Sequence, residues 1–207
     1  MMRGGLLCVV ALLAGCLSQP RTPEPALYDL GMAPAGRPMV PSTNAEPSAV
    51  RIRTSARSWL DSTAMHYRLV YVDPMRILTY AYARWVAPPS ELVGQRLRQR
   101  LTERGIGAGL GSAHEIDIDL EEYVQLFETP TQSFGRVTAH VRLLSGTSTK
   151  EATFTEQVAA QTPDAVGGVR ALAAATDVLI GRVVEWMVAG GEQAADAQSR
   201  PASPAAR

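Results

Sequence analysis

The segment 115–121 alternates polar and apolar residues at every step, and this pattern restricts the fold more than any other feature of the chain. Ile116, Ile118 and Leu120 share one side, and the other side carries four carboxylates: Glu115, Asp117, Asp119 and Glu121. A period of two is that of a β-strand with one buried face. The sequence therefore predicts a sheet that packs against other elements on one side only.

Other segments extend this pattern into a complete domain. Further strands are predicted over 50–56, 65–72, 76–84, 137–144 and 151–160. Asp73-Pro74 supplies a turn, which predicts a hairpin of the second and third of these strands. Helical spacing of apolar residues predicts one helix from Pro88 to Gly105 and another over 164–188. Together they predict an α+β fold, a two-layer sandwich of a mostly antiparallel sheet with two packed helices.

The first sixteen residues have the features of a bacterial lipoprotein signal. Arg3 is positively charged, an apolar run follows over 6–13, and Leu13-Ala14-Gly15-Cys16 places small residues before a cysteine. The apolar run is shorter than the roughly 20 residues of a spanning helix. We expect cleavage between Gly15 and Cys16 and acylation of Cys16. The alternative is an ordinary secreted protein in which Cys16 is incidental.

The residue after Cys16 bears on which membrane would hold the anchor. It is Leu17 rather than Asp. Under the sorting rule of enteric bacteria, this favours the outer membrane, with the domain facing the periplasm.

Composition divides the chain into four parts. Residues 1–15 are the predicted signal peptide, and 16–48 form a lipidated, proline-rich tether. Residues 49–188 form the folded domain, and the alanine-rich residues 189–207 are expected to be disordered. Within the tether, the segment 26–30 (Ala-Leu-Tyr-Asp-Leu) is a candidate for a short first strand.

Charge and cysteine content exclude several classes of protein. The whole chain has 20 basic and 20 acidic residues, so that removal of Arg3 with the signal leaves it near neutrality. Nucleic-acid binding would favour a strongly basic face, and no such partner is expected. The cysteines are Cys8 and Cys16, and Cys8 leaves with the signal. The mature chain then has neither a disulfide nor a free thiol nucleophile.

Motifs that would indicate catalysis are weak. The glycines at 105, 107, 109 and 111 follow a helix and precede a strand, the reverse of a dinucleotide-binding turn. The carboxylates of 115–121 would suit a cation or acid–base chemistry, but a solvated strand face with arginine partners such as Arg136 or Arg142 explains them without a further assumption. The histidines are on separate predicted strands or their edges: His66, His114 and His140. We expect no enzyme, no cofactor and no metal site.

The aromatic segment 78–85 is the best candidate for a partner-binding surface. It carries Tyr80, Tyr82, Arg84 and Trp85, and aromatic and arginine side chains are enriched at interfaces. Substitution of Arg84 or Trp85 is then expected to weaken partner binding and leave the domain folded. The alternative is that these side chains belong to the core and edge of the sheet.

This segment, followed by Pro88 and a helix that begins Ser90-Glu91-Leu92, resembles the ABC-type transport auxiliary lipoproteins, the PqiC- and YmbA-like proteins. Three further stretches match the family besides Cys16: Tyr28-Asp29-Leu30, Trp59-Leu60-Asp61 and Leu126-Phe127-Glu128. Two turns depart from it, over 62–65 and 129–131.

The resemblance implies a role rather than a reaction. It implies an outer-membrane lipoprotein that docks an ABC transporter system with a mammalian-cell-entry (MCE) domain protein, which moves lipids between membranes. Self-assembly into a homo-oligomer is also implied. The alternatives are a periplasmic lipid- or solute-binding carrier and a structural chaperone of an outer-membrane assembly.

Overall fold

The computed structural model describes residues 23–32, 49–107 and 114–199, with side chains as far as Ala189. Cys16 and the predicted signal peptide lie outside these residues. The elements in chain order are β1 (Ala26–Tyr28), β2 (Val50–Ala56), the short 3-10 helix η2 (Ser58–Leu60), β3 (Ala64–Leu69), β4 (Leu78–Trp85), α2 (Pro89–Glu103), β5 (His114–Thr129), β6 (Gln132–Ser145), β7 (Ser148–Ala159) and α3 (Ala165–Ser199).

The seven strands of the described residues belong to one mixed sheet of order β1-β4-β3-β5-β6-β7, with β2 also beside β5. The 16-residue strand β5 is long enough to hold two strands on one edge: β2 along its first half and β3 near its end, both parallel to it. The long ladders β5–β6 and β6–β7 and the hairpin β3–β4 are antiparallel, as the sequence predicts. The parallel pairs β1–β4, β2–β5 and β3–β5 make the sheet mixed.

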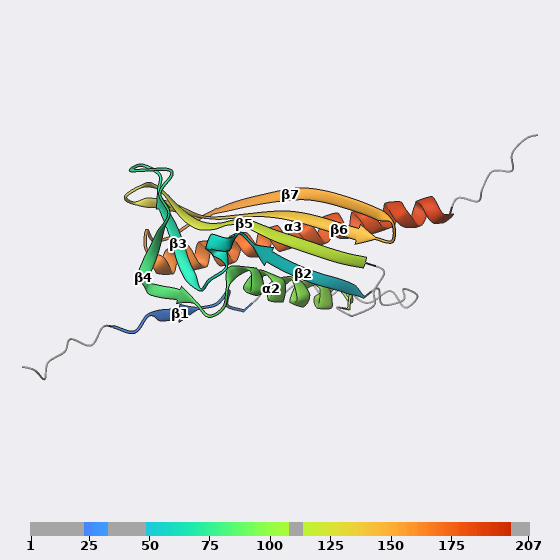
Figure 1. Cartoon of the computed structure of the whole chain (residues 1–207), viewed down its shortest axis with the longest axis horizontal. Helices are drawn as coiled ribbons and strands as arrows, with labels where there is room; N and C mark the ends of the chain where they lie inside the picture. Colours follow the sequence, from blue (N-terminus) through green and yellow to red (C-terminus); the bar gives the residue numbers. More distant parts are fainter. Residues whose placement is uncertain (1–22, 33–48, 108–113, 200–207) are drawn as a thin grey trace, which may run out of the picture.

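The two predicted helices are present, and they form the second layer. Helix α3 packs along β5, β6 and β7, while α2 packs against β2, β5 and α3 (Figure 1). The apolar side of segment 115–121 faces this layer, because Ile116, Ile118 and Leu120 are almost fully buried. The α+β two-layer prediction is therefore confirmed.

A β-bulge explains why β5 continues beyond the predicted strand end. The register with β6 shifts between Leu120 and Glu122, so the side chains that face the helices change from even to odd numbers. Tyr123 is accordingly buried, and its hydroxyl lies 3.2 Å from the Thr176 hydroxyl of α3. A bulge inserts one residue and shifts the polar–apolar alternation by one position. The second half of β5 therefore does not continue the pattern of 115–121, and that pattern predicted only the first half of the strand.

The boundaries of the predicted domain change at both ends. The segment expected within the tether does form a strand, because β1 pairs in parallel with β4 from Ala26 to Tyr28. At the other end, α3 continues to Ser199, beyond the predicted end of the domain at residue 188. Residues 192–199 contain Glu, Gln, Ala, Asp and Ser without a proline, and glutamate, glutamine and alanine favour helix without needing a core contact.

Candidate functional site

The face of the sheet opposite the two helices is a charged surface that we call the open face. Arg51, Arg53 and Arg57 extend from β2 and the loop after it, next to the carboxylate row of β5 (Glu115, Asp117, Asp119 and Glu121), while β6 and β7 contribute His140, Arg142 and Glu151. The face arises directly from the alternation, since the apolar residues between these side chains point to the helix layer.

Ion pairs connect the carboxylate row to the strands beside it. The Arg53 Nε lies 2.8 Å from the Glu115 carboxylate, and the Arg57 guanidinium lies 2.7 Å from that of Glu121. On the other side, Arg142 lies 3.9 Å from Asp117 and 2.8 Å from Glu151. The cross-strand partnership predicted for Arg142 is therefore confirmed.

The partnership predicted for Arg136 is wrong. Its guanidinium donates to the Gln157 amide oxygen at 2.8 Å, because Arg136 pairs with Val124, beyond the bulge and away from the carboxylate row.

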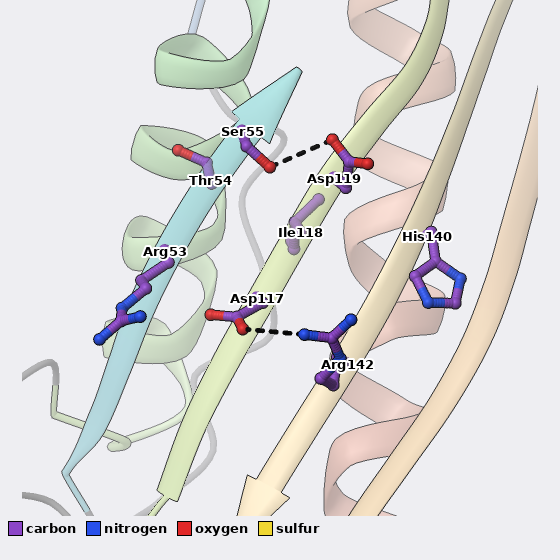
Figure 2. Close-up of a pocket in the computed structure, with 8 residues that line it drawn as sticks. All are labelled: Arg53, Thr54, Ser55, Asp117, Ile118, Asp119, His140 and Arg142. Carbon is purple, nitrogen blue, oxygen red and sulfur yellow. Dashed lines mark hydrogen bonds and ion pairs between the residues drawn. The ribbon is translucent and has the colours of Figure 1, made fainter. Parts of the chain in front are cut away.

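A pocket of about 380 Å³ opens on this face between β2, β5 and β6. Figure 2 shows Ser55 turned toward Asp119, to which its hydroxyl donates at 3.1 Å, and Arg142 turned toward Asp117. The His140 ring lies toward β7, with Nε2 3.6 Å from Glu151 and Nδ1 3.3 Å from the Thr153 hydroxyl. The pocket therefore presents positively charged donors (arginine) and negatively charged acceptors (aspartate), which suit a polar ligand or a protein surface.

A second pocket, of about 280 Å³, lies at the other end of the open face. Its lining includes two arginines and two glutamates, Arg68, Arg136, Glu122 and Glu128. Like the first pocket, it includes two arginines and two carboxylates, so charged side chains of both signs lie near both ends of β5 on this face.

The three histidines do not form a common centre. His66 lies beneath the Trp59 ring at a centroid distance of 5.2 Å, and its burial lowers the pKa of the imidazole. His140 is paired as described above, and His114 begins β5 at the far end from His66. Among the residues that the structure describes, no three histidine, cysteine or carboxylate side chains are grouped so as to hold a metal ion.

The aromatic segment of β4 divides between core and surface. Trp85 is 1% exposed and stacks edge-on against Tyr123 at a centroid distance of 5.5 Å. The expectation that Trp85 presents a partner surface is therefore wrong, because β4 turns this ring toward the helix layer. Tyr80 is half-buried, its hydroxyl donates to the Gln125 amide oxygen at 2.8 Å, and burial raises the pKa of its hydroxyl. Tyr82, 57% exposed, and the partly exposed Arg84 remain available to a partner.

Arg96 has a structural role that the sequence did not predict. Arg96 of α2 is only 4% exposed, and its guanidinium donates to the carbonyls of Leu30 at 2.6 Å and Gly31 at 2.8 Å. Its Nε also lies 3.5 Å from the Asp177 carboxylate of α3, whose pKa is raised by burial. Arg96 thus holds the segment after β1 against both helices. Its position four residues after Leu92, within the apolar stripe of α2, was the available signal.

Comparison with known proteins agrees with this architecture. A crystal structure of a DUF330 family protein from Xanthomonas campestris superposes with a TM-score of 0.70 at 17% identity, over 84% of this chain and all of that one. The crystal structure of an uncharacterized protein superposes with a TM-score of 0.65 at 11% identity, over 80% of this chain and 99% of that one. No curated protein sequence matches the chain.

The family can be stated from a sequence match that covers most of the chain. The model of the ABC-type transport auxiliary lipoprotein component matches residues 28–188, from the end of β1 to within α3. Within the described part of the chain, no helix is both long enough and apolar enough to cross a membrane. The fold also agrees, since DUF330 proteins are this same family. The chain therefore belongs to the ABC-type transport auxiliary lipoprotein component family.

Proposed function

We propose that this protein is an outer-membrane lipoprotein that faces the periplasm and docks an ABC-type, MCE-associated lipid transport system to that membrane, and that it is not an enzyme. The observation that carries the proposal is the family match over residues 28–188, which spans nearly all of the folded part of the chain. The signal sequence and the acylation of Cys16 supply the membrane attachment.

The short distance along the chain between the anchor and the sheet supports a docking role. Strand β1 begins at Ala26, and at most about 35 Å of extended chain separates this residue from Cys16. An acylated protein of this design holds its domain next to the membrane, where a periplasmic partner that reaches the membrane would meet it.

The polarity of the open face favours docking over carriage of a lipid. Each of the two pockets described above has two arginines and two carboxylates in its lining, whereas sites for apolar ligands are predominantly apolar and carry few charged groups. Rows of paired charges suit a protein partner, because complementary charges orient two surfaces without a large apolar area. Tyr82 and Arg84 are the residues of the family-like segment that we propose contact this partner.

A pull-down from detergent-solubilised membranes tests the proposal. The tagged full-length protein should recover an MCE-domain protein and the ABC transporter components, and Tyr82→Ala or Arg84→Ala should reduce the recovery. Arg98→Ala removes an exposed arginine from α2, away from this segment, and is the matched control for Arg84→Ala. Cys16→Ser should shift the protein out of the outer-membrane fraction.

Other results would replace the proposal with a named alternative. Recovery of lipid without any MCE-domain protein would favour a carrier. Recovery of an unrelated outer-membrane assembly would favour a structural chaperone. Retention of Cys16→Ser in the membrane fraction would contradict anchoring through that residue.

A further inference from the structure

The loop that joins β3 to β4, which we call the hairpin tip (residues 70–77), exposes three large apolar side chains. Tyr71 is 46% exposed, Val72 67% and Met75 87%. Exposed apolar residues scattered singly are common, but three within five consecutive residues at the end of a hairpin form a local patch. The patch lies outside the open face and is not used by the proposed docking residues Tyr82 and Arg84.

The backbone of the hairpin tip is hydrogen-bonded both within the tip and to the neighbouring strands β3 and β5. The Val70 amide donates to the Phe127 carbonyl of β5 at 2.9 Å, and the Met75 amide donates to the Asp73 carboxylate at 2.9 Å. The amides of Val72, Asp73 and Arg76 also donate to carbonyls of the tip or its base, and the Arg68 guanidinium donates to the Pro74 carbonyl. Satisfied backbone groups lower the cost of moving a turn into a less polar medium.

The start of β1 is directed toward the end of the domain that carries the hairpin tip. Strand β4 begins beside the tip at Leu78 and runs away from it, and β1 lies parallel to β4 with Ala26 opposite Ala83. The chain that precedes Ala26 is therefore directed back toward the end that carries the tip. Figure 1 shows the start of β1 and the hairpin tip toward the same end of the long axis, with β1 on the lower side and the tip on the upper side, and the β6–β7 turn at the other end.

We propose that the hairpin tip is a second membrane contact, in which Tyr71, Val72 and Met75 enter the headgroup region of the membrane that holds acylated Cys16. Tyrosine favours the boundary between acyl chains and water, and the adjacent exposed Arg76 suits acidic headgroups. The inference rests on the proposed function, because the acyl anchor is what brings the tip to lipid.

Two contacts would fix the orientation of the domain, which a flexible tether alone does not. Strand β5 spans 16 residues, or about 50 Å, from the β6–β7 end to the tip end. With the tip on the membrane, the β6–β7 turn and the distal part of α3 point into the periplasm. The membrane contact therefore sets the direction in which the open face meets its partner.

Site-specific fluorescence on the full-length lipidated protein tests this contact. Met75→Cys, labelled with an environment-sensitive dye, is reconstituted into vesicles of phosphatidylethanolamine and phosphatidylglycerol, and quenching by lipid-attached quenchers is measured. Thr147→Cys in the exposed β6–β7 turn is the matched control at the opposite end. We expect a blue-shifted emission and strong quenching at position 75, while position 147 keeps the emission of a dye in water and is not quenched.

Flotation of the same samples separates this inference from the proposed function. Vesicles that carry the protein while positions 75 and 147 are quenched equally would overturn the tip contact and leave the lipoprotein role intact. A protein that does not float would overturn both, since neither acyl group nor tip would then hold it on lipid. Protection of position 75 only after a soluble protein partner is added would assign the tip to that protein and also overturn the membrane contact.

Discussion

Gly135 in β6 provides a strong test of the packing between the sheet and α3. A Cβ atom placed on Gly135 would lie 2.5 Å from the Leu172 amide nitrogen and 2.6 Å from the Ala171 carbonyl carbon, both in the backbone of α3. Ordinary carbon contacts are about 3.5 Å or longer, so α3 would have to move by about 1 Å. Overpacking of this kind costs about 1–3 kcal/mol, and Gly135→Ala should lower the free energy of unfolding by that amount.

Gly181 is the matched control because the same substitution there should have the opposite sign. It lies within α3, and an added Cβ would meet nothing within 4 Å. Alanine is favoured over glycine in a helix interior by about 1 kcal/mol. Gly181→Ala should therefore raise the free energy of unfolding.

Chemical denaturation followed by circular dichroism measures both variants, and thermal melting supplies a second readout. For a domain of this size the expected shift is about 2–4 °C per kcal/mol. The reasoning is refuted if Gly135→Ala is as stable as the unaltered protein, because α3 would then not approach β6 as closely as the structure shows. Equal destabilisation by both substitutions would instead point to a general intolerance of alanine.

Three further predictions concern single side chains. Trp85→Ala should cost about 3–5 kcal/mol of unfolding free energy, whereas Tyr82→Ala should stay within about 0.5 kcal/mol; similar costs in denaturation would contradict their assignment to core and surface. The Gly167 amide and the Thr162 hydroxyl donate to Asp164 and lower its pKa. The ionised carboxylate therefore stabilises the fold above about pH 4, and this stabilisation is lost as pH falls through the lowered pKa. Asp164→Ala should lower the free energy of unfolding by about 1 kcal/mol near neutral pH. The difference from the unaltered protein should become smaller in acid. Arg96→Met removes the donor to the Leu30 and Gly31 carbonyls and the nearer of the two arginines beside Asp177, and it should cost about 3 kcal/mol or more. Amide hydrogen exchange in residues 23–32 should become faster; unchanged exchange there would contradict the role of Arg96 in holding that segment.

The elements that the sequence predicted well depend on neighbours along the chain. The period of two in 115–121 predicted both the strand and its buried side, and Asp73-Pro74 predicted the turn between β3 and β4. Pro89 begins α2 and Gly105, with φ of 74°, follows its end. These features depend on local conformational preferences and side-chain alternation, which a linear sequence displays directly.

The candidate site includes residues whose positions the local sequence pattern did not predict. The carboxylate row and its Arg142 partner followed from alternation, but Arg136 lies past a bulge that no local pattern reveals. Trp85 and Tyr82 belong to the same aromatic segment, yet one is core and the other is exposed. The distinction depends on Tyr123, which reaches Trp85 from another strand.

The sequence by itself determined the α+β class, the polar side of the sheet, the positions of most strands and helices, and a resemblance to a lipoprotein family. Only the tertiary structure decided that β2 and β3 share one edge of β5, that β1 runs parallel to β4, and that Arg96 closes over the segment after β1. Strand neighbours and buried charge partners are far apart in the chain, and many pairings satisfy the same local pattern. The choice among them is made by the burial of apolar surface and the pairing of buried polar groups in the folded whole.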